Sequence, residues 1–195
     1  MLDLAVIFTG HMIDLPGRER PRFPPVMESV VADVIKMTIG ELSERTEGSL
    51  VGIASGARGS DILFLEIVQD LGLETRVVLP LPPEQFIPAS VAGVASGDWE
   101  DRFQALWSRH SVDEREVIAI GTGRERYVAC NSRMVALGRS LAKSTALLAY
   151  WDGASGDGTG GTQSFVEMMR TAGGEVLHLD AAELYRNFLS AGLGQ

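Results

Sequence analysis

The sequence is short of the residues that build disulfides and metal sites. Its 195 residues include a single cysteine, Cys130, which rules out an internal disulfide and any paired-cysteine metal motif. Three histidines, His11, His110 and His178, are spread along the chain without the spacing of metal ligands. We therefore expect no structural zinc, no metal ligands and no resident cofactor.

Positive charge and long apolar runs are also scarce. The 17 lysines and arginines are outnumbered by 26 aspartates and glutamates, which gives a net charge of −9. This balance disfavours nucleic acid or an anionic membrane as a partner, because both bind a basic face. No apolar run reaches the roughly 18 residues of a membrane span, and no cationic segment precedes the first apolar run. We expect a cytoplasmic protein, and its abrupt start is also typical of a domain excised from a longer chain.

Short apolar runs alternate with segments of helical periodicity along the chain. The expected strands cover residues 4–9, 50–55, 74–79, 117–120, 146–150 and 175–179. Helices are expected between them, for example at residues 127–143 and 163–170. The alternation predicts a single Rossmann-like three-layer α/β domain, residues 1–195, with a mostly parallel sheet of about six strands.

Glycines follow several of the expected strands. Gly10 ends the first strand, Gly56 and Gly59 follow the second, and Gly158 to Gly161 lie between residues 146–150 and the last long helix. Parallel strands place these loops at one edge of the sheet, where open α/β sheets bind ligands. Glycine admits positive φ and close approach of a ligand, and helix starts leave amides unpaired. The pattern indicates an anion held by main-chain amides; the alternative is a flexible surface turn.

Side chains near these loops complete the candidate site. Arg58 either grips a phosphate or is a solvated loop arginine, and Ser60 or Asp61 is expected to cap the following helix. Asn131 lies on an apolar helical stripe, so its amide needs a ligand or a loop backbone as partner. His11 either donates to a ligand or caps its loop. The candidate ligand contacts are Gly10, His11, Ser55, Gly56, Arg58, Gly59, Asp61, Asn131, Gly158, Thr159, Gly160, Gly161 and Thr162.

Taken together, these motifs resemble the SLOG superfamily, which groups the Rossmann-like domain of the DNA-processing protein DprA with the LOG phosphoribohydrolases. The resemblance covers nearly the whole chain and is to a bacterial, sensor-type subfamily. It implies binding of a nucleotide-derived small molecule, ADP-ribose-like or cyclic-nucleotide-like, by a sensor domain in signalling or bacterial defence. A fused effector domain or a homo-oligomer is compatible with that role. The matching segments are residues 10–14, 55–62, 78–80 with Phe86, 98–103, Asn131 with Met134, and 158–162.

One departure from the family pattern bears on activity. LOG enzymes carry a Gly-Gly-x-Gly-Thr-x-x-Glu motif whose glutamate takes part in cleaving the N-glycosidic bond, and this chain has Phe165 at that position. Glu167 lies roughly 200° further around the helix. We expect binding without catalysis, with Phe165 stacked on a base or packed in the core.

Two other functions remain as alternatives. The first is a LOG-like phosphoribohydrolase or nucleotide N-glycosidase that uses Asp61, Asp157 or Glu167 in a different arrangement. The second is DprA-like binding of single-stranded DNA, which the net charge of −9 disfavours.

Overall fold

The sheet is parallel throughout the part of the chain that is described. The computed structural model describes residues 1–154 and 160–192. Its strands form one six-stranded sheet in the order β4-β3-β2-β1-β5-β6, and each printed pairing is parallel. The strands are β1 (Leu2–Gly10), β2 (Leu50–Ala54), β3 (Glu74–Leu79), β4 (Arg115–Val117), β5 (Ala142–Trp151) and β6 (Glu175–Asp180).

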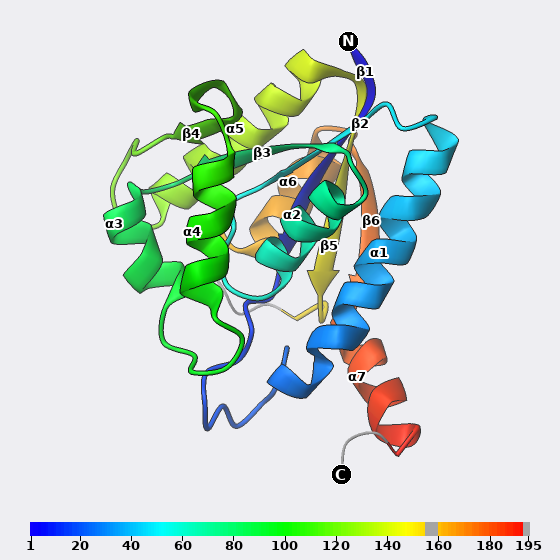
Figure 1. Ribbon diagram of the computed structural model, residues 1–195, viewed down its shortest axis with the longest axis vertical. Helices are drawn as coiled ribbons and strands as arrows, with labels where there is room; N and C mark the ends of the chain where they lie inside the picture. The colour runs from blue at the N-terminus through cyan, green and yellow to red at the C-terminus, as the bar shows by residue number, and fades with distance from the viewer. Residues whose placement is uncertain (155–159, 193–195) are drawn as a thin grey trace.

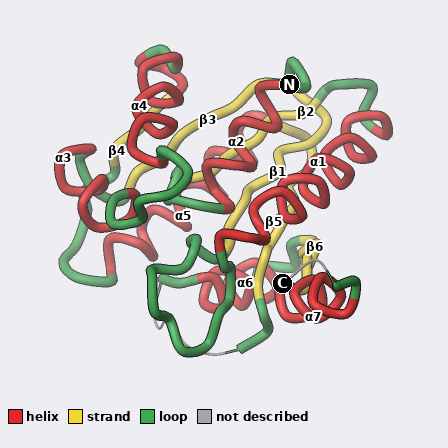
Figure 2. Tube along the Cα trace, turned by 60° about the horizontal axis from the view of Figure 1, so that its bottom comes forward, coloured by secondary structure: helices red, strands yellow, loops and turns green. Residues whose placement is uncertain are grey.

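Helices cover both faces of this sheet (Figures 1 and 2). One face carries α1 (Glu28–Arg45), α2 (Ser60–Asp70), α4 (Trp99–Arg109) and α7 (Ala181–Ser190). The other face carries α5 (Glu125–Leu141) and α6 (Thr162–Thr171), which lie behind the sheet in Figure 1. Shorter elements are η1 (Pro25–Met27), α3 (Pro83–Phe86), η2 (Ile87–Val91) and η3 (Val112–Glu114). The three-layer α/β fold expected from the alternation of strands and helices is therefore confirmed.

The middle strand shows why the apolar runs are continuous. Successive side chains of a strand point to opposite faces, so a strand with helices on both sides is apolar at every position. In β1, Val6 and Phe8 pack with α1 and α2, whereas Ala5 and Ile7 pack with α5 and α6. Phe8 also stacks on Phe64 of α2, with ring centroids 4.7 Å apart.

The edge strand β4 differs from the expectation. The apolar run at residues 117–120 predicted a strand there, but pairing ends at Val117, and Ile120 is 65% exposed. β3 sets this limit, because it ends at Leu79, the partner of Val117, and the last bond between the two segments is from the Ile118 N–H to the Leu79 oxygen at 2.9 Å. Ile118 still packs against the core on the α5 face, whereas Ile120 lies outside the sheet.

The order in which successive strands are added to the sheet reverses once. It moves from β1 outward through β2 and β3 to β4, and α5 then returns it to β5 on the other side of β1. Connections thus leave β1 and β5 in opposite directions, which opens a crevice at the carboxyl ends of the strands. Within the described residues, no helix has both the length and the apolar character needed to cross a membrane.

Two helical glycines test how closely α5 lies on the sheet. A Cβ at Gly138 would lie 3.2 Å from Thr145 Cγ2 and 3.3 Å from Ala5 Cβ, whereas a Cβ at Gly40 in α1 meets nothing within 4 Å. We expect Gly138→Leu to lower the free energy of unfolding by about 1–3 kcal/mol through overpacking. Gly40→Leu is expected to raise it by roughly 0.5–1 kcal/mol, because leucine favours helix more than glycine does. Urea denaturation measures both, and equal effects would contradict the close packing.

Candidate functional site

A cavity of about 350 Å³ lies at the carboxyl edge of the sheet. Its wall is made by the loops after β1, β2 and β3, the first half of α5 and the start of α6. The structure therefore brings together segments that are far apart in the sequence. Of the residues singled out in the sequence, those on the wall are Gly10, His11, Ser55, Asp61, Asn131, Gly160, Gly161 and Thr162.

The remaining candidates lie beside the cavity or outside the described residues. Arg58 is buried, and its guanidinium donates to the backbone oxygens of Ile13 (3.4 Å) and Ala92 (3.2 Å). Gly56 and Gly59 have positive φ and shape the turn before α2, but they do not line the cavity. Gly158 and Thr159 fall in the segment that is not described. Arg58 therefore connects the loop before α2 to the loops that contain Ile13 and Ala92, and it does not line the cavity.

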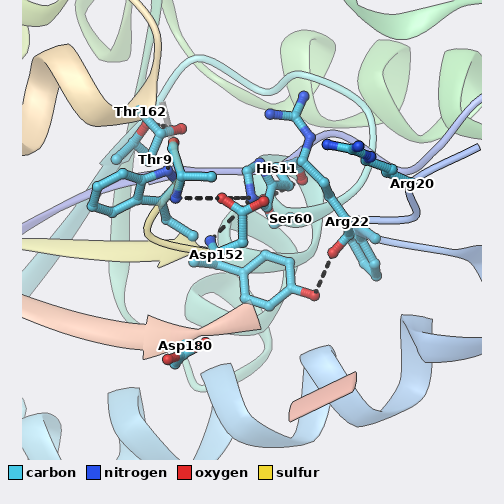
Figure 3. A network of polar contacts seen from close by, with 12 residues as sticks. Thr9, His11, Arg20, Arg22, Ser60, Asp152, Thr162 and Asp180 are labelled. Atoms are coloured by element: carbon cyan, nitrogen blue, oxygen red, sulfur yellow. Dashed lines mark hydrogen bonds and ion pairs between the residues drawn. The ribbon is translucent and has the colours of Figure 1, made fainter. Parts of the chain in front are cut away.

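The end of β1 lies against the start of α2. A Cβ at Gly10 would overlap Ser60 Oγ and would lie 3.0 Å from Tyr150 Cβ, so only glycine fits there. Ser60 Oγ donates to the backbone oxygen of His11 at 2.8 Å (Figure 3). The first and second glycine loops are thus joined by contacts between the Ser60 side chain and the main chain of Gly10 and His11.

His11 joins the first loop to the loop that follows β5. Its side chain is almost fully buried, and its Nε2 accepts the backbone N–H of Asp152 at 3.1 Å (Figure 3). The same nitrogen lies 3.2 Å from Asp152 Oδ1. Of the two roles expected for His11, the geometry supports fastening of the loop.

The N-cap of α2 differs from the expectation. Gly59 occupies the cap position and contributes no side-chain hydrogen bond, so the predictions of Ser60 or Asp61 as the cap are wrong. The positive φ of Gly59 turns the chain into the helix one residue earlier, which leaves the Ser60 hydroxyl for His11. Asp61 Oδ2 instead accepts the backbone N–H of Ala57 at 3.4 Å.

Two titratable groups lie deep in the site. Burial raises the pKa of Asp61 to about 7, although the backbone N–H groups of Ala57, Gly56 and Ser55 partly oppose that rise. Burial also raises the pKa of Cys130 to about 12, and its thiol donates to the backbone oxygen of Val78 at 3.2 Å. Cys130 is therefore a neutral core residue, whereas the Asp61 carboxyl changes charge close to neutral pH.

The start of α6 presents backbone amides at the same edge. Its N-cap is Gly161, which has no side chain to accept the first N–H groups of the helix. Thr162 is the first helical residue and not the cap, and its hydroxyl lies 3.3 Å from that of Thr9. Asn131 Nδ2 donates to the backbone oxygen of Gly160 at 3.3 Å, so the Asn131 amide has a loop backbone as a partner while it lines the cavity.

Sequence reasoning missed the two arginines on the wall, Arg22 and Arg124. Arg22 belongs to the proline-rich loop after β1, where its backbone N–H donates to Asp14 Oδ2 (2.8 Å) and its carbonyl accepts from the Tyr150 hydroxyl (3.4 Å), as Figure 3 shows in part. Arg124 immediately precedes α5. Neither position stands out in composition or periodicity, because the path of a loop determines which of its side chains reach the cavity.

The residues considered as possible catalytic groups at and near the LOG glutamate position do not form a cluster. Phe165 is fully buried in the core between α6 and the sheet and does not line the cavity. Glu167 is exposed and accepts a hydrogen bond from Gln163 Nε2 at 2.8 Å. Asp157 lies outside the described residues. The described part of the chain also contains no cluster of three or more potential metal ligands.

Comparison with known proteins does not assign the chain to a family. No protein-family model matches the chain, and a search of curated proteins finds no significant match. A solved structure described as the X-ray structure of TM1055, a Northeast Structural Genomics Consortium target, is 14% identical and has a TM-score of 0.40. The similarity covers 88% of this chain and 71% of that one. A likeness of this strength carries no conclusion about function.

Gly160 offers a test of the contact between the loop before α6 and the start of α5. Its φ is +87°, and a Cβ there would lie 2.7 Å from Tyr127 Cβ, whereas Gly173 has a φ of +70° and open space. We expect Gly173→Ala to cost about 1 kcal/mol of unfolding free energy from backbone strain alone. Gly160→Ala is expected to cost at least about 1 kcal/mol more, because the loop must also move away from α5. Urea denaturation of both variants measures the difference; equal losses would show that the contact contributes nothing.

Proposed function

We propose that the cavity binds a nucleotide-derived small molecule and that the protein is a ligand-sensing domain. The observation that carries this proposal is the composition of one cavity wall. An uncapped helix start, two arginines and a set of apolar side chains meet where the connections of the sheet diverge. Such crevices are the usual ligand sites of open α/β sheets.

The start of α6 is the best place for the phosphate. Both α2 and α6 begin at this edge with a glycine cap, and both leave amides for an anion. The first turn of α2, however, already carries Asp61, while the first turn of α6 has no acidic residue. A negative ligand group is therefore favoured at α6 and repelled at α2 once Asp61 is ionised.

Cationic and hydroxyl groups on the wall add to this preference. Arg22 and Arg124 bring positive charge to a cavity in a chain whose net charge is −9. The hydroxyls of Thr9 and Thr162 lie 3.3 Å apart, so that one donates to the other and the proton of the second is left for a phosphate oxygen. The positive field is local, so an acidic protein can still attract a small anion.

The remaining wall suits a flat ring. Phe8, Phe86, Met134 and Pro80 line the cavity together with the neutral polar side chains of Ser55 and Asn131. Its volume of about 350 Å³ lies within the range of small-molecule sites, roughly 300–1,000 Å³. Ring faces bind well to aromatic and thioether side chains.

The motif resemblance supports the sensor role. Gly10, Ser55, Asn131 and Gly160, which contribute to the resemblance to SLOG domains, all line this cavity. ADP-ribose-like and cyclic-nucleotide-like molecules are the ligand classes that this resemblance suggests. Both combine phosphate with a flat base, and so match the charged and the apolar parts of the cavity wall.

An enzyme is the second candidate, because the Asp61 carboxyl has a pKa of about 7 and lines the cavity. Glycoside cleavage, however, ordinarily uses two carboxyl groups on either side of the bond. Among the described residues Asp61 is the one acidic side chain on the wall. The geometry therefore favours binding over hydrolysis.

The ligand proposal is tested with ADP-ribose, AMP and 3′,5′-cyclic AMP. A ligand at 100 times its Kd stabilises the protein by about 2.7 kcal/mol, which raises the Tm of a chain of this size by roughly 5–10 °C. Arg22→Gln combined with Arg124→Gln is expected to weaken binding more than about tenfold in calorimetry, since two charge-assisted contacts are lost. Arg139→Gln, an exposed position outside the cavity, is the control and should bind normally. No Tm shift with any of the three ligands at millimolar concentration would contradict the proposal.

Hydrolysis is expected to be absent or very slow. Phe165 lies in the core, and Glu167 is exposed outside the cavity wall. AMP and cytokinin-type nucleotides are incubated with the protein, and released base and ribose phosphate are measured by chromatography. A turnover of about 1 s⁻¹ or more, within the ordinary enzyme range, would favour the second candidate.

A further inference from the structure

We propose that Asp61 selects the ligand by accepting a hydrogen bond from an N–H group at the end opposite the phosphate. In an adenine nucleotide this group is the exocyclic amine of the base. The inference rests on the proposed function and adds the orientation of the ligand and the group that is recognised. It follows from where Asp61 lies relative to α6 and from what surrounds its carboxyl.

The sheet fixes the orientation. Asp61 follows β2, Gly161 follows β5, and β1 lies between these two strands. Neighbouring strands are about 4.8 Å apart, so the two loops are separated by roughly 10 Å across the end of β1. Both residues line the same cavity. A phosphate at the start of α6 therefore leaves the rest of the ligand extending over Gly10 toward Asp61.

The carboxyl of Asp61 is buried but lies on the cavity wall, within reach of a ligand. The residue is 8% exposed, its Oδ2 accepts the Ala57 N–H at 3.4 Å, and the backbone N–H groups of Gly56 and Ser55 also stabilise the ionised form. These donors do not fully offset the cost of burial, because the pKa is still raised to about 7. A ligand N–H in the cavity would supply a further donor to the ionised form.

Other charged and titratable groups approach the cavity from each side. The segment after β1 contributes His11 and Arg22, and α5 with its preceding residue contributes Tyr127 and Arg124. Cys130, also on α5, has a pKa of about 12 and stays neutral. The Nε2 of His11 accepts the backbone N–H of Asp152. A variant at Asp61 tests whether the pH dependence of binding comes from its carboxyl.

The direction of the pH effect follows from linkage. Below pH 7 the carboxyl is protonated, and accepting an N–H with the ionised oxygen requires that the proton be released. Affinity for an N–H-bearing base should therefore rise about tenfold per pH unit as the pH approaches 7, and should level off above it. An analogue without the N–H gains nothing from ionised Asp61.

The experiment compares matched ligand pairs between pH 5.5 and 8.5. ADP-ribose, AMP and 3′,5′-cyclic AMP are each paired with the analogue whose base carries hydrogen in place of the amino group. Taking the ratio of Kd values within a pair cancels the titration of the AMP phosphate, whose second pKa is about 6, whereas the diester phosphates of the other two ligands do not titrate in this range. We expect the amino form to bind at least about tenfold more tightly at pH 8, and the preference to shrink at pH 5.5.

Asp61→Asn should remove the pH dependence of this ratio, because the amide does not titrate. Asp180→Asn is the charge-matched control, since Asp180 caps α7 and does not line the cavity. If Asp61→Asn fails to fold, the pH dependence of the Kd ratio in the unaltered protein still tests the inference. Equal binding of both members of a pair at every pH would overturn the inference and leave the proposed function standing. Failure of all six ligands to bind would overturn both.

Discussion

The site depends on the close packing of the Gly10 main chain, at the end of β1, against two side chains. Gly10 lies so near the side chains of Ser60 and Tyr150 that a side chain of its own does not fit, and this contact brings the end of β1 against the start of α2 and the end of β5. The Ser60 hydroxyl then bonds to the His11 carbonyl, and the His11 ring to Asp152. With this packing in place, the loops after β1, β2 and β5 bound one cavity instead of standing apart as separate turns.

Sequence patterns predicted the fold better than they predicted the contacts. A strand that is buried on both faces of the sheet has a continuous apolar run, so the strands around β1 and the helices between them can be recognised in the sequence. β4 was misplaced because an edge strand lacks that constraint and ends with its partner at Leu79. The loop glycines were identifiable as structurally important, because few other residues fit where neighbouring atoms approach the main chain closely. The cap of α2 and the two cavity arginines were missed, because they depend on loop paths that periodicity does not encode.

Electrostatics divides the cavity into unlike halves. The chain as a whole is acidic, yet the wall carries Arg22 and Arg124, and α6 adds the partial positive charge of its first turn. Across β1, the first turn of α2 holds a buried carboxyl instead. The N-termini of two helices thus present opposite charge to one space, which would favour a single orientation for the proposed ligand.

The return of α5 from β4 to β5 also bears on how the protein folds. β1 is made first, but one of its two neighbours is β5, so that Leu4 pairs with Ser144. Until that later segment has been synthesised, one edge of β1, whose middle residues are apolar and buried in the folded protein, has no partner, and such edges attract other chains. Pairing across so much intervening sequence is slow. The cavity, whose wall includes the start of α6, is consequently among the final parts of the molecule to form.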